Sequence, residues 1–485
     1  MTATPVLSVA SEAFPLAKTG GLGDVAGALP PALSAEGFAV RTLMPAYPEA
    51  LGMLRDAQPV LSRPSLFGGT ARVLAGRVGE LDVLLLDAPH LFGRGGGLYV
   101  DTAGKEWPDN AQRFAALSQV AADLAQGAAP GFLPEVVHAH DWQAGLVPAY
   151  LRYRGGRRPA TVFTAHNLSF QGQFPAALLP ALGLPPEAMA IDGIEYFGGI
   201  GYLKAGLAIA DHITTVSPRY AMEIRTPEFG MGLEGLLAHR AAVLSGILNG
   251  IDIGLWNPQA DAALAARFSA ETLARRADNK AALQARLGLA QDPRALLFGV
   301  VSRLTWQKGT DLLLAALPEM LRVGGQLALV GSGEAELEAG VRAAQAAHPG
   351  RVGAVVGFDE NLAHLMQGGV DALLVPSRFE PCGLTQLCAL RYGALPIVSR
   401  VGGLADTVSD ANEMDLVPTA GNGFQFGPVT REALAIAIER AAAVWHEPER
   451  WRRLQRHAMA ADVSWRKPAR AYAALFRSLL TARGG

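Results

Sequence analysis

The sequence has few cysteines, no long hydrophobic run and almost no net charge. Its two cysteines, Cys382 and Cys388, lie in one short segment. Two neighbouring thiols are poor material for a disulfide framework, and they fit a reducing compartment. We therefore expect a cytoplasmic protein.

The first residues and the balance of charge exclude further classes. The start, MTATPVLSVASEAFPLAK, lacks a basic region followed by a long apolar core, and no apolar run reaches the roughly 18 residues of a membrane span. We expect neither an export signal nor a membrane helix. With 42 basic and 44 acidic residues, the net charge is −2, which gives no general attraction to nucleic acid or to an anionic membrane. Any anion-binding site must therefore be local.

Several nucleotide and hydrolase motifs are also missing. The sequence contains neither a P-loop nor a G-x-S-x-G motif, which argues against a P-loop NTPase and an α/β-hydrolase. Gly21, Gly23 and Ala26 satisfy the relaxed dinucleotide fingerprint. However, residues 11–18 separate these glycines from the first predicted strand, and the second strand, 40–45, ends without an acid. NAD binding is therefore a minor alternative.

What is present is a repeated alternation of strands and helices. The chain has 485 residues, which is long for one core, and its 55 glycines fall mostly at strand-to-helix turns. Aliphatic runs without polar alternation indicate buried parallel strands, and an alanine-rich helical pattern follows most of them. The predicted strands are residues 6–10, 40–45, 83–89, 136–140, 161–167 and 212–218 in a first series, and 296–304, 327–333, 352–358, 372–377 and 395–400 in a second.

The two series predict an α/β protein with two doubly wound parallel sheets. We expect an N-terminal Rossmann-like domain at 1–248 and a C-terminal one at 249–460. The stretch 247–258, with an Asn-Gly turn, a tryptophan and a proline, is the predicted hinge, and a polar helical stretch follows it to about residue 288. Residues 461–485 contain a helix that we expect to pack back on the first domain.

The loop KTGGLGDV, residues 18–25, combines a cation with bare backbone. Lys18 stands beside Gly20 and Gly21, and exposed N–H groups next to a cation form an anion site. The alternative is a structural turn with a solvated lysine. A similar sequence, VGGLADTV, occurs at 401–408, and the two loops could face one another across a cleft.

Two stretches of the second half follow predicted strands and carry charge. In SRLTWQKGTD (302–311), Arg303 and Lys308 can converge on one anion, such as a diphosphate, although they could be ordinary surface cations. In PSRFEPCGLTQL (376–387), Glu380 lies at a loop tip, where the alternative is a solvated acid. The helix that follows offers its N-terminal amides to a second anion.

Polar residues also follow strands of the first half, in HAHDW (138–142) and AHN (165–167). Two histidines of the first phrase suggest a metal, but no third ligand with a recognised spacing follows, so we expect none. Asp141 and His166 are better interpreted as polar groups for a hydroxylated ligand, with Trp142 as a packing residue or a sugar-facing ring.

Taken together, these phrases resemble the bacterial glycogen synthase and plant starch synthase family, which are retaining glucosyltransferases of the GT-B fold. The match runs nearly end to end, through SEAFPLAKTGGLGDV, HAHDWQAGLVPAYL, TAHNLSFQG, TPEFGMGLEGLL, LNGID with WNP, SRLTWQKGTD, PSRFEPCGLTQL and VGGLADTV. The resemblance implies two Rossmann-like domains facing across a cleft. It also implies transfer of glucose from ADP-glucose to the non-reducing 4-hydroxyl of an α-1,4-glucan such as glycogen, with retention and release of ADP.

The same resemblance implies roles for individual residues. Those matching catalytic positions are Arg303, Lys308, Glu380, His166 and Asp141. Those matching further ADP-glucose contacts are Lys18, Gly20, Gly21, Asn249, Gly331, Cys382, Gly383, Leu384 and Thr385. Those matching acceptor or supporting positions are Glu12, Asp24 and Trp142. Many retaining GT-B enzymes carry a second glutamate eight residues after the first, whereas this sequence has Cys388 there; glycogen synthases generally lack that acid.

The expected chemistry needs no cofactor and no metal, because protein cations stabilise the leaving diphosphate. No carboxylate nucleophile is identifiable, so the resemblance favours front-face attack through a short-lived ion pair. Since Lys18 and the Arg303–Lys308 pair belong to different predicted domains, we expect the donor to draw the two together. A UDP-glucose enzyme, or one making another polymer, remains the nearest alternative, and a catalytically silent glucan-binding module is another. The oligomeric state stays open.

Overall fold

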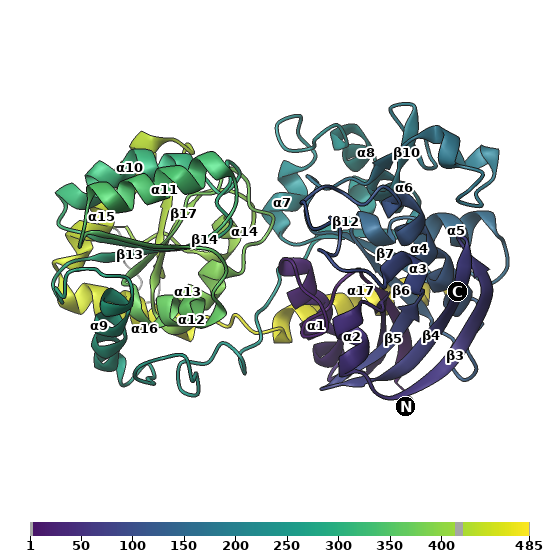
Figure 1. The fold of residues 1–485 in the computed structure, drawn as a ribbon, viewed down its shortest axis with the longest axis horizontal. Coiled ribbons are helices and arrows are strands. Elements are labelled where there is room, and N and C mark those ends of the chain that lie inside the picture. The colour runs from purple at the N-terminus through teal and green to yellow at the C-terminus, as the bar shows by residue number, and fades with distance from the viewer. Residues whose placement is uncertain (1–2, 413–420, 485) are drawn as a thin grey trace. The chain divides into compact units, whose positions relative to one another are not determined.

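The computed structural model describes residues 3–412 and 421–484. The chain folds into two compact units. Unit 1 comprises Met1–Asn249 and Trp465–Gly485, and unit 2 comprises Gly250–Ser464. The chain therefore leaves unit 1 once, completes unit 2 and returns to unit 1 for its last helix (Figure 1).

Unit 1 is built on a nine-stranded sheet with the order β12-β11-β7-β6-β1-β2-β5-β4-β3. Neighbours from β12 to β5 pair in parallel, while β4 and β3 add an antiparallel edge. A small antiparallel sheet, β8-β10-β9, lies apart from it. The strands are β1 (Thr4–Val9), β2 (Phe38–Pro45), β3 (Arg55–Leu66), β4 (Gly69–Val78), β5 (Leu81–Asp87), β6 (Val136–His140), β7 (Ala160–Ala165), β8 (Gln173–Phe174), β9 (Glu195–Tyr196), β10 (Gly199–Gly201), β11 (His212–Thr215) and β12 (Leu244–Gly246).

Helices cover both faces of the large sheet. On one face, α1 (Gly21–Ser34) and the C-terminal α17 (Arg466–Gly484) lie side by side, and Phe476 of α17 meets Phe38 edge-on at 5.4 Å between ring centroids (Figure 1). The C-terminal segment is thus part of the core of unit 1. The remaining helices of this unit are α2 (Pro48–Met53), α3 (Pro89–Phe92), α4 (Asn110–Ala125), α5 (Val147–Tyr153), α6 (Tyr202–Ile209), α7 (Pro218–Glu223) and α8 (Glu234–His239).

Unit 2 contains a six-stranded, entirely parallel sheet with the order β15-β14-β13-β16-β17-β18. This is the 3-2-1-4-5-6 order of the doubly wound fold. The strands are β13 (Leu297–Val301), β14 (Gln326–Gly331), β15 (Val352–Val356), β16 (Ala372–Val375), β17 (Leu395–Ser399) and β18 (Phe424–Phe426). The helices are α9 (Arg276–Arg286), α10 (Thr310–Arg322), α11 (Ala335–Ala347), α12 (Glu360–Gly369), α13 (Thr385–Tyr392), α14 (Gly402–Thr407), α15 (Arg431–Trp445) and α16 (Pro448–Ala460).

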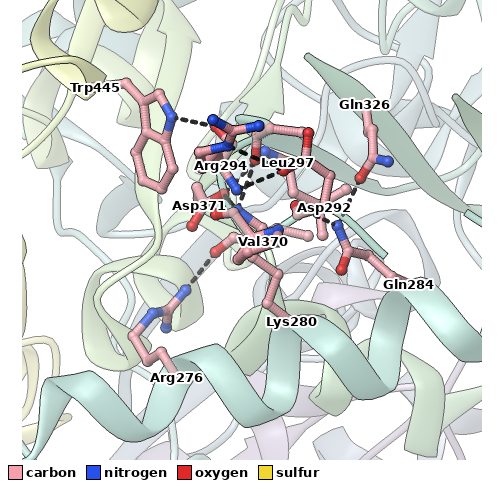
Figure 2. Close-up of polar contacts among 12 residues, drawn as sticks. Arg276, Lys280, Gln284, Asp292, Arg294, Leu297, Gln326, Val370, Asp371 and Trp445 are labelled. Carbon is pink, nitrogen blue, oxygen red and sulfur yellow. Dashed lines mark hydrogen bonds and ion pairs between the residues drawn. The ribbon is translucent and has the colours of Figure 1, made fainter. Parts of the chain in front are cut away.

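A buried polar cluster fastens α9 to the amino ends of the central strands of unit 2 (Figure 2). The Lys280 ammonium donates to Asp371 Oδ2 at 2.7 Å, and the Leu297 backbone N–H donates to the same oxygen at 2.9 Å. Arg276 donates to the Val370 carbonyl, and burial lowers the pKa of its guanidinium to about 10. These contacts hold α9 against the amino ends of β13 and β16.

Each predicted run overlaps a parallel strand, and the run at 136–140 coincides with β6, but the short parallel strands β12 and β18 were not predicted. The β3–β4 hairpin was missed. Most of β3 is exposed and it carries prolines at positions 59 and 64, so the apolar signal used to detect buried strands is absent there. The helical stretch expected up to 288 is shorter in the structure, where α9 begins at Arg276.

Candidate functional site

In unit 2, the predicted charged loops meet where the strand order reverses. Strands β13 and β16 are neighbours in the sheet, although three helices and two strands separate them in sequence. Loop 302–309 leaves the carboxyl end of β13, and loop 376–384 leaves that of β16. The crevice outside the carboxyl ends at such a switch point is where doubly wound folds bind ligands.

The two loops bring a cation and an acid together. Lys308 Nζ lies 2.5 Å from Glu380 Oε2, which also accepts a hydrogen bond of 2.9 Å from Ser377 Oγ. Both charged side chains are largely withdrawn from solvent, with exposed fractions of 18% and 7%. Arg303 is exposed, and none of the described carboxylates pairs with its guanidinium. The structure therefore holds the Glu380 carboxylate against Lys308 and leaves the Arg303 guanidinium available to an anion.

Backbone donors lie next to the acid. Residues Cys382, Gly383 and Leu384 lead into α13, which begins at Thr385. Among the described residues, none accepts a hydrogen bond from the backbone N–H groups of positions 383 to 385. Open N–H groups at the start of a helix attract anions. The N–H groups of positions 383 to 385 are thus open to an anion, and the ADP-glucose contacts expected for Cys382, Gly383, Leu384 and Thr385 stay predictions.

Glycines let the backbone segments at this edge approach closely. A Cβ on Gly331, at the end of β14, would lie 1.9 Å from the Ser302 carbonyl oxygen. Gly402, with φ of +40°, and Gly403 pack beneath the acidic loop, where added Cβ atoms would lie 2.0 Å from the Glu380 oxygen and 2.3 Å from the Cys382 oxygen. The Gly403 N–H also donates to the Glu380 carbonyl at 3.1 Å. The second glycine pair therefore supports the loop that carries Glu380.

In unit 1, Glu12 organises the first glycine loop. Its carboxylate accepts hydrogen bonds from the backbone N–H of Thr19, from that residue's hydroxyl at 2.9 Å and from the Tyr99 hydroxyl at 2.8 Å. The Gly20 N–H points at the same carboxylate over 3.4 Å. Burial raises the pKa of Glu12, while these hydrogen bonds oppose that rise. Part of the N–H array that the sequence assigned to a phosphate thus faces a protein carboxylate.

Lys18, Gly20 and Gly21 are among the exposed residues of this loop. Lys18 Nζ forms an ion pair with Asp24 Oδ1 at 2.7 Å, and both side chains are partly exposed. A Cβ on Gly20 would meet no atom within 4 Å, and α1 begins at Gly21. Asp24 was expected to act as a supporting residue, and its contact is with the lysine itself. The roles proposed for Lys18, Gly20 and Gly21 toward a donor stay predictions.

Asp141 and His166 follow the adjacent strands β6 and β7 and are buried. Asp141 Oδ1 accepts from the His166 backbone N–H at 2.6 Å, and the aspartate has a φ of +54°, which is rare for a residue with a side chain. Strain of this kind concentrates at functional positions. Burial raises the pKa of Asp141 to about 7, because the charged form loses its hydration.

Three imidazoles form a buried row behind this pair. His140 Nδ1 lies 3.0 Å from His166 Nε2, and the rings of His138 and His140 lie 4.0 Å apart. Burial lowers the pKa of His138 and of His166 to about 3, so all-neutral imidazoles are favoured here. Among the described residues, no group of three or more His, Cys, Asp or Glu side chains is arranged to hold a metal ion.

The last two predicted residues of unit 1 differ in their surroundings. Trp142 is buried, and its ring meets Phe114 edge-on with centroids 4.9 Å apart, so it packs in the core. Of the two interpretations that the sequence allowed, packing is the one the geometry favours. Asn249 is also buried, and its Oδ1 atom has no partner among the described residues. An unsatisfied buried acceptor is costly, which makes Asn249 a candidate for ligand contact.

Comparison with known proteins identifies the family. The model of the starch synthase catalytic domain matches residues 5–239, and that of glycosyl transferases group 1 matches residues 281–457. A glycogen synthase of Rhodopseudomonas palustris strain TIE-1 is 61% identical over 483 residues, with 100% of each chain covered. The chain belongs to the glycogen synthase family. Another glycogen synthase, from Acidiphilium cryptum strain JF-5, is 60% identical over 98% of this chain and 99% of its own.

A solved structure agrees with the family assignment. The catalytic domain of starch synthase IV from Arabidopsis thaliana, bound to ADP and acarbose, superimposes with a TM-score of 0.90 at 33% identity, covering 99% of this chain and 100% of its own. The expected GT-B fold and the resemblance to glycogen and starch synthases are therefore confirmed. The chain is a glucosyltransferase of this family. No helix in the described part of the chain has the length and apolar character needed to cross a bilayer.

Three residues at the site of this glycogen synthase family member were not predicted from the sequence. Tyr99 lies far from Glu12 in sequence, so its hydroxyl contact could not be foreseen. Arg378 sits inside the motif that was analysed, but only the fold reveals that it faces Asp311. Phe358 follows β15 at the carboxyl edge with 86% of its surface exposed. For Phe358, the available signal was an aromatic residue at the last position of the predicted strand 352–358.

Proposed function

We propose that this enzyme transfers glucose from ADP-glucose to the non-reducing 4-hydroxyl of an α-1,4-glucan, with retention of configuration and release of ADP. The proposal rests on the carboxyl edge of the sheet in unit 2, around the switch point between β13 and β16. Among the described residues, this edge carries Arg303 without a carboxylate partner, the Lys308–Glu380 ion pair and the open N–H groups before α13. A diphosphate suits cations and N–H donors, and sugar hydroxyls suit a carboxylate. Support for ADP also comes from the Arabidopsis relative, which is described with ADP bound.

Charge development at the reacting bond explains the proposed roles. As the bond from the anomeric carbon to the diphosphate breaks, negative charge grows on the phosphate and positive charge on the sugar. Arg303 and Lys308 stabilise the first, and Glu380 holds the sugar hydroxyls. Because these cations strengthen their interaction as the charge grows, they accelerate the chemical step rather than only tightening binding. Phe358 offers an exposed ring face to the adenine base.

Unit 1 is proposed to serve the acceptor and the transferred glucose. Asp141, Asn249 and His166 provide hydrogen-bonding groups with little fixed charge, and Lys18 adds a cation for the donor phosphates. No carboxylate nucleophile is assigned. Instead, the leaving phosphate takes the acceptor proton during front-face attack, so the glucosyl unit keeps its configuration.

Product measurements test this function directly. We expect ADP release from ADP-glucose only when an α-1,4-glucan is present, with a much lower rate of UDP release from UDP-glucose. Proton NMR of the elongated maltooligosaccharide should show a new α-1,4 linkage. We also propose that the enzyme needs no metal, so activity should survive treatment with EDTA. Faster turnover of UDP-glucose, or release of ADP without any glucan product, would contradict the proposal.

A further inference from the structure

We propose that Arg378 is a positioning residue that locks the cation-bearing loop 302–309 onto the acid-bearing loop 376–384, so that Arg303 and Lys308 are held ready for an anion. This inference deepens the proposed function and rests on it for its kinetic consequences. The structural part of the claim stands on contacts within unit 2 alone.

The two loops are joined first through backbone groups. The Arg378 N–H donates to the Gln307 carbonyl at 2.8 Å, and the Gln307 side chain donates back to the Phe379 carbonyl at 3.2 Å. Gly309, with φ of +69°, allows the loops to touch, because a Cβ there would lie 2.1 Å from the Pro376 oxygen. The contact is therefore too close for any other residue at position 309.

The Arg378 side chain then closes the junction. Its guanidinium binds the Asp311 carboxylate through both oxygens, at 2.7 and 2.6 Å, and donates to the Trp306 carbonyl at 2.7 Å. It also lies over the Trp306 ring, 4.4 Å from its centroid. Hydrogen bonding to Arg378 lowers the pKa of Asp311. Because Asp311 is in the first turn of α10 and Trp306 lies between Arg303 and Lys308, one side chain holds the second half of the cationic loop and the start of the helix that follows it.

The geometry explains why an arginine is needed. Two parallel N–H···O bonds and stacking on an indole require a planar fork, which lysine cannot supply. The guanidinium directs these hydrogen bonds to protein atoms, so Arg378 acts through the neighbouring cations rather than on a ligand. Arg303 makes no ion pair with any described carboxylate, so the position of its guanidinium depends on the loop that carries it. Small displacements of positioned groups cost up to about 100-fold in rate.

Three variants test the proposal beside a matched control. Arg378→Met removes the fork and keeps the aliphatic stem, Arg378→Lys keeps the charge, and Asp311→Asn removes one partner. The control is Arg440→Met, since Arg440 similarly binds a carboxylate, Asp410, at 2.9 Å and a backbone carbonyl, and lies over an aromatic ring, but on α15. All four proteins are compared as full chains by melting temperature, steady-state kinetics and hydrogen exchange.

We expect Arg378→Met to lower kcat about 10- to 100-fold with a loss of melting temperature similar to that of the control. Arg378→Lys should recover less than half of the lost activity, and Asp311→Asn should show a smaller fall in kcat. Peptides covering 302–309 should exchange faster in Arg378→Met, because the amides of Lys308 and Gly309, which donate to the Thr305 and Trp306 carbonyls in the turn that Arg378 binds, lose their protection. Arg440→Met should leave both kcat and this exchange unchanged.

The outcomes separate the two claims. Unchanged exchange at 302–309 in Arg378→Met, or full rescue of kcat by Arg378→Lys, would overturn the positioning role. If Arg378→Met does not fold, Asp311→Asn carries the same two readouts and decides the claim in the same way. If the unmodified enzyme released no ADP from ADP-glucose, the proposed function would fail, while faster exchange in the variants would still support the lock between the loops.

Discussion

The two glycine pairs followed by leucine have similar sequences but opposite surroundings. In unit 2, the carbonyl oxygens of Glu380 and Cys382 pack against Gly402 and Gly403. They lie so close that a Cβ on either glycine would clash with them. In unit 1, a Cβ on Gly20 would meet nothing within 4 Å. One glycine pair therefore supports a neighbouring loop, whereas Gly20 of the other pair has open space at the position of a Cβ.

The same contrast extends to the two carboxyl edges of the sheets. Unit 2 places fixed cations and an acid there, bound to one another by short contacts. Unit 1 places buried groups that favour their neutral forms, such as Asp141 and His166. Under the proposed function, this difference suits the carboxyl edge of unit 2 to a diphosphate, and the Asp141–His166 edge of unit 1 to an uncharged, hydroxylated ligand. Four predictions test the contrast, beginning with the largest expected effect.

Lys308→Ala should remove leaving-group stabilisation from the cationic edge. If the magnitudes known for oxyanion sites apply, kcat falls about 10²- to 10³-fold, which corresponds to roughly 3 to 4 kcal/mol. Part of the loss arises because Glu380 is left buried without its cation. The measurement is ADP release at saturating donor and glucan, with Arg440→Met as the control. Near-normal turnover of Lys308→Ala would count against the account.

Gly403→Ala should damage the fold of the supporting loop. The new Cβ would lie 2.3 Å from the Cys382 carbonyl oxygen, and backbone atoms must shift to admit it. Overpacking of this kind typically costs about 1 to 3 kcal/mol of unfolding free energy. Denaturant unfolding measures the loss, and activity should fall with it because Glu380 is displaced. Wild-type stability in this variant would show that the close approach is not required.

Asp141→Asn should change how stability depends on pH. The pKa of Asp141 is about 7 in the folded protein and near 3.8 when unfolded, so folding takes up a proton between these values and the wild type loses stability as pH rises through them. The amide does not titrate, so its stability relative to wild type should increase from pH 4 to pH 7, by at most about 1.4 kcal/mol per pH unit. Urea unfolding at pH 5, 6 and 7 measures this. A constant difference would refute the raised pKa.

Gly20→Ala should have the smallest effect on the fold. Its extended backbone, with φ of −165°, accepts alanine, and open space surrounds the position. The melting temperature should therefore stay within the error of the wild type, as for most exposed substitutions. If the donor phosphates approach this backbone, the KM for ADP-glucose rises about tenfold. An unchanged KM would leave the loop without a role in donor binding.

Buried strands could be predicted from the sequence more completely than the side-chain contacts of the site residues. Uninterrupted aliphatic runs indicate strands covered on both faces, which is why the parallel cores of both units were found. The exposed β3 strand lacks such a run. The hydrogen-bond and ion-pair partners of the site residues could not be predicted for another reason. Glu12 meets Tyr99 and Arg378 meets Asp311 only through tertiary packing, so no local pattern in the chain indicates either pair.

Calorimetric titration of ADP into four proteins tests the central contrast most directly. The proteins are the wild type, Arg303→Ala, Lys308→Ala and Asp141→Asn. If the cations of unit 2 hold the diphosphate, the first two variants should each bind ADP at least about tenfold more weakly, while Asp141→Asn should stay within about twofold of the wild type. Unaltered ADP affinity in both cation variants would contradict the account.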